Sequence, residues 1–138
     1  MITIDVERHG LVAVDEDEER ARFVEAGRLR ARRAALEGSG RPVRVLVEVQ
    51  RRFGGLAPRA LLGARFLPVP NTDTVFEVDY APGGASAACP SRLWSRPFTV
   101  GLPEEFASAV LDVLLADATS WPAGALRVDR AGFDEIES

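Results

Sequence analysis

The alternation of apolar and polar side chains predicts most strands of this chain. Residues 2–7 (ITIDVE) alternate in this way, which is typical of a half-buried strand. Residues 11–14 (LVAV) either continue this strand after a bend at residues 9–10 or return as its hairpin partner. Residues 43–50 (VRVLVEVQ) place valines on one face and form the clearest strand, and residues 75–80 (VFEVDY) predict another.

Two segments have the features of helices. Residues 16–37 begin with acids and end with arginines, an order that complements the helix dipole, and Gly38 and Pro42 then provide a stop. This segment has few large apolar residues, so we expect it to pack by a narrow stripe and to be dispensable for folding. Residues 103–117 start at a proline, continue with two glutamates and carry a broad apolar stripe, which predicts a helix packed on the sheet.

Glycine and proline mark the remaining connections. Residues 51–72 are expected to form a long connection with a short helical turn at 58–62, and residues 81–97 a second loop. Residues 125–137 are expected to form a strand that turns at 131–132 and returns.

Together these elements predict one domain over residues 1–138 with an α+β fold. We expect a two-layer β-α-β sandwich, in which a mixed four-stranded sheet carries helices on one face. The strands come from residues 2–14, 43–50, 74–80 and 125–137. The expected buried core consists of Val45, Val47, Phe76, Val78, Phe106, Val110, Val113 and Leu114.

Composition narrows the class of protein. The chain has 138 residues, of which 46% are hydrophobic and 28% charged, as in ordinary globular domains. It has no apolar run long enough for a membrane span and no signal-peptide pattern at residues 1–10, so we expect a cytoplasmic protein. A single cysteine and a single histidine exclude a disulfide framework and a zinc site built from these residue types. No metal or cofactor is therefore expected.

The charge is unevenly distributed along the chain. The formal net charge is −4, yet residues 20–65 hold 12 arginines and 3 acids, and all 17 basic residues are arginine. These arginines either form a solvated, self-neutralised surface or bind phosphate or carboxylate groups, which the planar guanidinium suits. The candidate partner-binding residues are Arg28, Arg30, Arg32, Arg33, Arg41 and Arg44. Because the whole chain is acidic, we expect a protein partner or self-association ahead of RNA, and neither DNA nor a membrane.

Residues with catalytic chemistry are sparse. No P-loop, GxSxG, HExxH or EF-hand pattern is present, and no catalytic residue is predicted. The acids Asp129, Asp134, Glu135 and Glu137 lie close together near residue 138, so a small enzyme using this cluster is the alternative to a solvated turn. Cys89 and His9 lie far apart in the sequence, and each is interpreted as incidental.

Several short patterns occur in an order that resembles a known family. Residues 38–49 form a basic Gly-rich loop leading into a strand, residues 75–78 (VFEV) a second strand, and residues 101–110 a GLP segment opening a helix. A PAG turn follows at residues 122–124, and residues 130–138 (RAGFDEIES) are similar to a closing hairpin. In this order, residues 38–138 resemble the fourth domain of translation elongation factor G and of the tetracycline-resistance ribosomal protection proteins.

This resemblance implies a left-handed β-α-β crossover and a non-catalytic domain that binds a macromolecule. In the family, the Gly-rich loop and the final hairpin form a tip that enters the ribosomal decoding centre. The matching tip hairpin here would contain Arg130, Phe133, Asp134 and Glu135. The family's hairpin histidine is replaced by Asp134, and a carboxylate at this position disfavours contact with phosphates. The expected function is therefore a non-catalytic macromolecule-binding domain, with a ribosome- or RNA-binding protein as an alternative.

Overall fold

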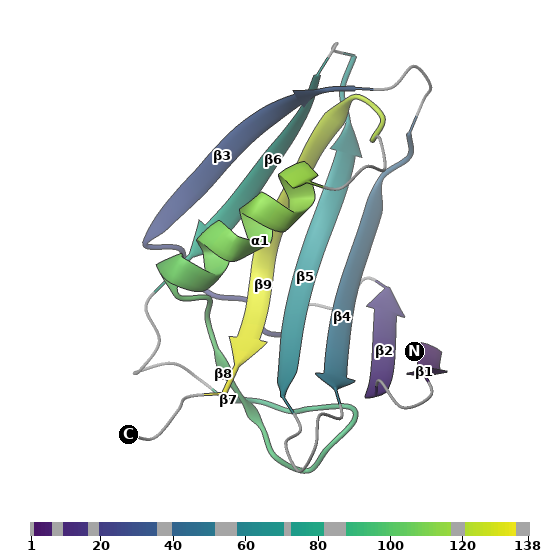
Figure 1. Ribbon diagram of the computed structural model, residues 1–138, viewed down its shortest axis with the longest axis vertical. Helices are drawn as coiled ribbons and strands as arrows, with labels where there is room; N and C mark the ends of the chain where they lie inside the picture. Colours follow the sequence, from purple (N-terminus) through teal and green to yellow (C-terminus); the bar gives the residue numbers. More distant parts are fainter. Residues whose placement is uncertain are drawn as a thin grey trace.

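A mixed β-sheet with one α-helix packed on it forms the described part of the chain, which is thus an α+β fold (Figure 1). The computed structural model describes residues 2–6, 10–16, 20–35, 40–51, 58–70, 73–81, 88–116 and 121–134. The first strands are β1 (Ile2–Val6), β2 (Gly10–Glu16), β3 (Gly27–Ala34), β4 (Val43–Arg51) and β5 (Arg59–Pro68). The later elements are β6 (Asp73–Tyr80), β7 (Ala88–Cys89), β8 (Phe98–Val100), α1 (Glu104–Ala116) and β9 (Gly124–Phe133).

The strand order is β1-β2-β4-β5-β9-β6-β3, and β7 and β8 extend the sheet beside the end of β9. Neighbouring strands are antiparallel except β6 and β9, which are parallel. A parallel pair needs a crossover connection, and the segment that includes α1 provides it. The β1–β2 pair aligns Ile2 with Val14, so the hairpin interpretation of residues 11–14 is confirmed.

Helix α1 lies over β6 and β3 on one face of the sheet (Figure 1). Pro103 precedes the helix, and its carbonyl accepts hydrogen bonds from the Phe106 and Ala107 amides. Ala107 is fully buried, and the helix packs further apolar side chains against Val78 and Val128. Among the described elements, no helix lies over the same face of β1, β2 and β4 (Figure 1).

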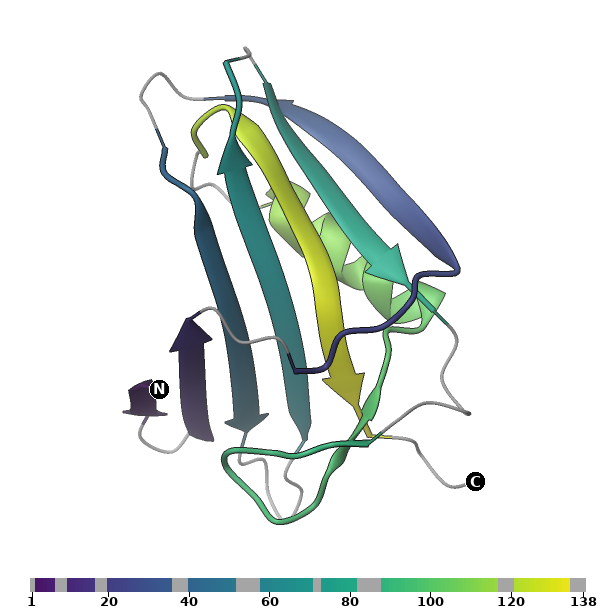
Figure 2. The same cartoon turned by 180° about the vertical axis from the view of Figure 1, so that it is seen from behind.

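The opposite face is covered at one end by extended chain (Figure 2). Residues 20–26 cross it, and the Ala131 amide donates a 3.0 Å hydrogen bond to the Ala21 carbonyl. Together with segments around Cys89 and Phe98, they enclose a second apolar cluster. On the same face of the sheet, Glu48 is 1% exposed and accepts hydrogen bonds from Ser91 and from the backbone amides of Arg92 and Leu93. The other end of this face stays open, and we call it the open face.

The predicted helix over residues 16–37 is wrong. Residues 27–34 form the edge strand β3, which pairs with β6, and residues 20–26 cross the sheet as extended chain. Leu29 alternates with arginines and packs into the cluster beneath α1, a burial that outweighs the helix propensity of Ala and Arg. The segment therefore contributes to the core, so the expectation that it packs only by a narrow peripheral stripe is also wrong.

Two further strand assignments differ from the prediction. Residues 51–72 contain the central strand β5 (Arg59–Pro68), and β9 continues through residues 131–132 where a turn was expected. In β9, Gly132 lies against the side chain of Phe98, so this glycine allows close packing and does not form a turn. Within the described residues the sheet consequently has nine strands, where four were predicted.

The predicted core is right for β6 and partly wrong for α1. Phe76 and Val78 are fully buried, whereas Phe106 is 44% and Val113 is 69% exposed. The remaining predicted core residues are half-buried: Val45, Val47, Val110 and Leu114. The helix is rotated so that Ala107 faces the sheet, since its small side chain allows a close approach.

Candidate functional site

A row of charged side chains crosses the open face. The strand register places Arg44 opposite Arg65, and Arg65 opposite Arg127. Glu77 lies opposite Arg127 on one side and Arg30 on the other. Residues directly opposite one another share a face, and neighbouring strands lie about 4.8 Å apart. We call Arg30, Arg44, Arg65 and Arg127, with Glu77 among them, the arginine row.

The sequence of β3 explains how one end of the row forms. Its side chains alternate, so that Leu29 and Ala31 point toward α1 while Arg28, Arg30 and Arg32 lie on the open face and are exposed. Edge strands commonly carry such charges because these oppose pairing with another chain. On β3 the charges also extend the row to the margin of the sheet.

Buried carboxylates hold the arginines in place from below. Asp79 is 2% exposed and accepts hydrogen bonds from Arg28 Nε at 2.6 Å and from Arg127 Nη2 at 2.8 Å. The hydrogen bond to Asp79 raises the pKa of Arg28 above its ordinary value, and the charges of Asp79 and Glu77 raise it further. Because these partners fix the guanidinium groups, a ligand would meet donors that are already ordered.

A second carboxylate supports the middle of the row. Asp129 is 9% exposed, forms a 3.4 Å ion pair with Arg65 and accepts a 3.1 Å hydrogen bond from Arg130 Nε. Arg130 itself is fully buried and donates to the Ala64 carbonyl at 2.9 Å. The Arg130 side chain passes over Gly63, where the register between β5 and β9 shifts. A Cβ atom on residue 63 would lie 2.8 Å from this side chain.

The chemistry of this face suits an anionic ligand. Arginines directly opposite one another repel, and an anion placed between them relieves that repulsion. Arg30 and Arg32 are exposed, and neither forms an ion pair with another of the described residues. The aromatic residues Phe66 and Phe76 alternate onto the α1 side, so the described strand positions around the row carry no aromatic side chain.

The structure brings together only some of the arginines predicted from the sequence. Arg28, Arg30, Arg32 and Arg44 share the open face. Arg33 lies on the α1 side and donates to the Leu115 carbonyl at 3.3 Å, near the end of the helix. Arg41 lines hollows next to Val43 and lies outside the row. Arg65 and Arg127 were missed, because only the strand order reveals that they are neighbours.

The residues of the expected tip hairpin do not form a separate tip in the described chain. Arg130 and Phe133 belong to the continuous strand β9, and Arg130 is fully buried. Asp134 accepts two hydrogen bonds from Arg59, at 2.7 and 2.9 Å. Glu135 lies outside the described residues.

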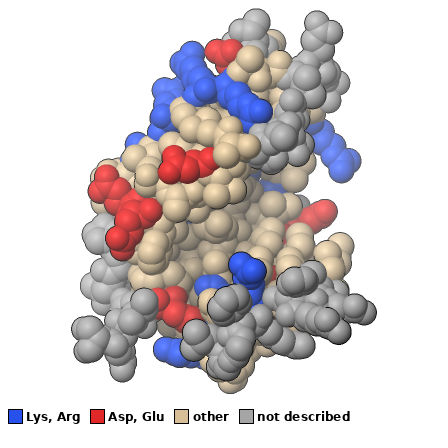
Figure 3. All heavy atoms as spheres, in the orientation of Figure 1, with Lys and Arg blue, Asp and Glu red and all other residues tan. Residues whose placement is uncertain are grey.

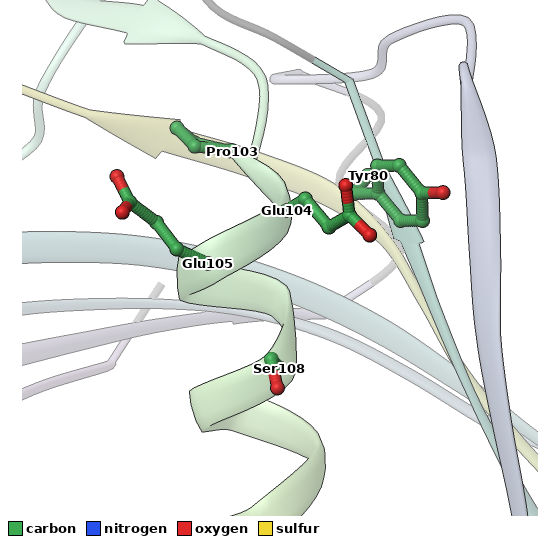
Figure 4. Close-up of a pocket in the computed structure, with 5 residues that line it drawn as sticks. All are labelled: Tyr80, Pro103, Glu104, Glu105 and Ser108. Atoms are coloured by element: carbon green, nitrogen blue, oxygen red, sulfur yellow. The ribbon is translucent and has the colours of Figure 1, made fainter.

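A hollow lies on the α1 side of the sheet, on the face opposite the arginine row. It measures about 600 Å³ and lies at the start of α1, lined by Tyr80, Pro103, Glu104, Glu105 and Ser108 (Figure 4). Figure 4 shows Glu104 extending toward Tyr80 while Glu105 points away from it. Both glutamates complement the positive end of the helix dipole.

The acidic cluster and the cysteine also give little support to an enzyme. Asp129 and Asp134 are paired with arginines, while Glu137 and His9 lie outside the described residues. No group of three metal-ligating side chains occurs among the residues that the structure describes. Burial raises the pKa of the Cys89 thiol, so it is held in its unreactive protonated form.

Comparison of the chain with protein-family models, with curated proteins and with solved structures finds no match. Within the described ranges, no helix combines the length and the apolar character needed to span a bilayer. The inference of function therefore rests on the geometry of the open face.

Proposed function

We propose that this chain is a non-catalytic binding domain whose arginine row holds an acidic segment of a protein partner. The observation that carries the proposal is the direct cross-strand alignment of Arg44, Arg65 and Arg127. Guanidinium groups bind carboxylates through paired hydrogen bonds, and ordered arginines lose less entropy on binding. A flat sheet face with several such forks suits an extended segment that carries several carboxylates.

The lack of aromatic side chains at the described strand positions around the row favours a protein ligand over RNA. Single-stranded RNA is commonly bound by stacking its bases on aromatic side chains, and the described strand positions around the row carry none. The net charge of −4 also opposes the long-range attraction of a nucleic acid. Carboxylates can pair with the row locally without requiring a basic molecule.

Kinship with the fourth domain of elongation factor G stays a hypothesis. It is supported by the order of β6, α1 and β9, in which two parallel strands are joined through a helix. The left-handed sense of this crossover belongs to the same hypothesis.

Binding of two labelled probes tests the proposal. An oligo-glutamate peptide and a single-stranded RNA of equal length are titrated with the protein at about 50 and about 200 mM salt, and fluorescence anisotropy is measured. We expect the peptide to bind more tightly than the RNA. Arg30→Ala and Arg65→Ala should each raise its Kd about threefold to tenfold, whereas Arg41→Ala, outside the row, should leave it unchanged.

Two results would overturn the proposal. The first is that the peptide does not bind at the lower salt concentration. The second is that the Arg30→Ala and Arg65→Ala variants bind the peptide as tightly as the wild type does. Tighter binding of the RNA, lost in the same variants, would replace the protein partner by a nucleic acid.

A further inference from the structure

The α1 side of the sheet carries a broad apolar surface that the helix does not cover. Alternation places valines and isoleucines of three adjacent strands on this side, where Ile2 is 62%, Ile4 48% and Val43 42% exposed. We call these residues the valine face: Ile2, Ile4, Val12, Val14, Val43, Val45, Val47 and Val49. Figure 3 shows an uncharged, hollowed region beside α1 on this side of the molecule. Exposed apolar patches of this kind mark interaction surfaces.

We propose that the valine face packs against the valine face of a second copy of this chain, face to face across a two-fold axis. The axis lies between the two sheets and runs across the strands, at the level of the paired residues Ala13 and Glu48. It exchanges the two ends of each strand, so the strands of one copy run against those of the other. Sheets packed in this way lie about 10 Å apart, with interdigitating side chains.

The charges at the two ends of the face favour this arrangement. Glu16 ends β2 and is paired with Val45, whereas Arg51 ends β4 at the opposite end of the face and is paired with Gly10. Both residues are exposed and alternate onto the same side as the valines. Because the axis exchanges these ends, Glu16 of each copy approaches Arg51 of the other. The face is therefore complementary to itself in charge as well as in apolar character.

The size of the face fits a dimer of low affinity. Strands β1, β2, β4 and β5 together are about 15–19 Å wide, and β2 and β4 are about 24–30 Å long. Phe106 and Val113 add exposed apolar side chains on α1, on the same side of the sheet. An apolar hollow of about 270 Å³, lined by Phe66 and Trp121, adjoins it and can receive projecting side chains. Over these strands the two copies together would bury about 700–1,150 Å², slightly below the standard interface size of about 1,200–2,000 Å², so we expect a weak dimer with a micromolar Kd.

The oligomeric state of the full chain tests this proposal. Sedimentation velocity is measured from about 1 to about 500 μM for the wild type and two matched variants. Val47→Asp places a charge in the middle of the valine face, and Leu67→Asp places one at a 51% exposed position on the open face. We expect the wild type and Leu67→Asp to dimerise, and Val47→Asp to stay monomeric with an intact cooperative melt.

Charge reversal tests the geometry without disturbing the apolar centre. Glu16→Arg and Arg51→Glu should each raise the dimer Kd about tenfold, and the double variant should return it to within about threefold of the wild type. Arg65→Ala should leave dimerisation unchanged, because it lies on the other face. A wild type that is monomeric at every concentration would overturn the dimer. Single reversals without effect, or a double variant that is not rescued, would overturn the two-fold arrangement.

Discussion

Substitution of Gly63 by alanine adds a single Cβ atom next to Arg130, which pairs with Asp129 beneath the arginine row. A Cβ at this position would lie 2.8 Å from the Cβ, Nε and Cζ atoms of Arg130, whose side chain is fully buried. Arg130 therefore has to move. It would weaken its hydrogen bonds to Asp129 at 3.1 Å and to the Ala64 carbonyl at 2.9 Å.

The expected loss follows from those contacts. Each buried hydrogen bond from a charged donor contributes about 1.5–3 kcal/mol, while alanine gains about 0.5–1 kcal/mol over glycine within a strand. The net expectation for Gly63→Ala is a loss of about 2–4 kcal/mol in the free energy of unfolding. For a chain of this size the Tm would fall by about 6–15 °C.

Urea denaturation followed by circular dichroism measures this loss, with the slope checked for constancy. Ala60→Gly, at an exposed position of the same strand, serves as the control and should cost less than about 1 kcal/mol. If Gly63→Ala is as stable as the wild type, the close contact between position 63 and Arg130 does not contribute to stability, contrary to this prediction.

Three further predictions concern the core and the loop next to Cys89. Val110→Ala should lower the free energy of unfolding by about 1–3 kcal/mol, whereas Val113→Ala, at a 69% exposed position, should change it by less than about 0.5 kcal/mol in the same assay. Glu48→Gln should cost about 2–3 kcal/mol, because the carboxylate accepts hydrogen bonds from Ser91 and from two backbone amides; an unchanged Tm would contradict this. Burial raises the pKa of the Cys89 thiol in the folded chain, so the unfolded chain loses the thiol proton at a lower pH. The free energy of unfolding should therefore fall above about pH 9. Urea titrations repeated from pH 7 to about pH 10 measure this decrease, and Cys89→Ala should remove it.

The sequence allowed the strands with strong alternation to be predicted, but not the arginine-rich edge strand. In residues 27–34, Ala and Arg favour a helix locally, and the alternation of Leu29 and Ala31 with arginines gives only a weak signal for a strand. Pairing with β6 decides in favour of the strand, because it places Leu29 beneath α1. This tertiary contact has no local signature.

The proline and the glycine of β5 misled the prediction for a related reason. Pro68 ends the strand, and Gly63 lies in its middle because Arg130 needs the space above it. A glycine that accommodates a distant side chain cannot be distinguished in the sequence from one that forms a loop.

The candidate site could be predicted only in part. Arg30 and Arg44 were among the expected binding residues, since they lie in the arginine-rich stretch. Arg65 and Arg127 are 62 residues apart in the sequence and become neighbours only through the pairing of β5 with β9. Strand order, on which the row depends, is not encoded in any short pattern.

Binding of an acidic partner at the arginine row can be located residue by residue. Its most direct test is an NMR titration of the protein with the oligo-glutamate peptide, in which backbone amides and arginine Nε–H groups are followed together. We expect the largest shift changes at Arg30, Arg65 and Arg127, and no change at Val12 and Val47 on the valine face. Changes confined to the valine face or to the start of α1, with the row unmoved, would contradict it.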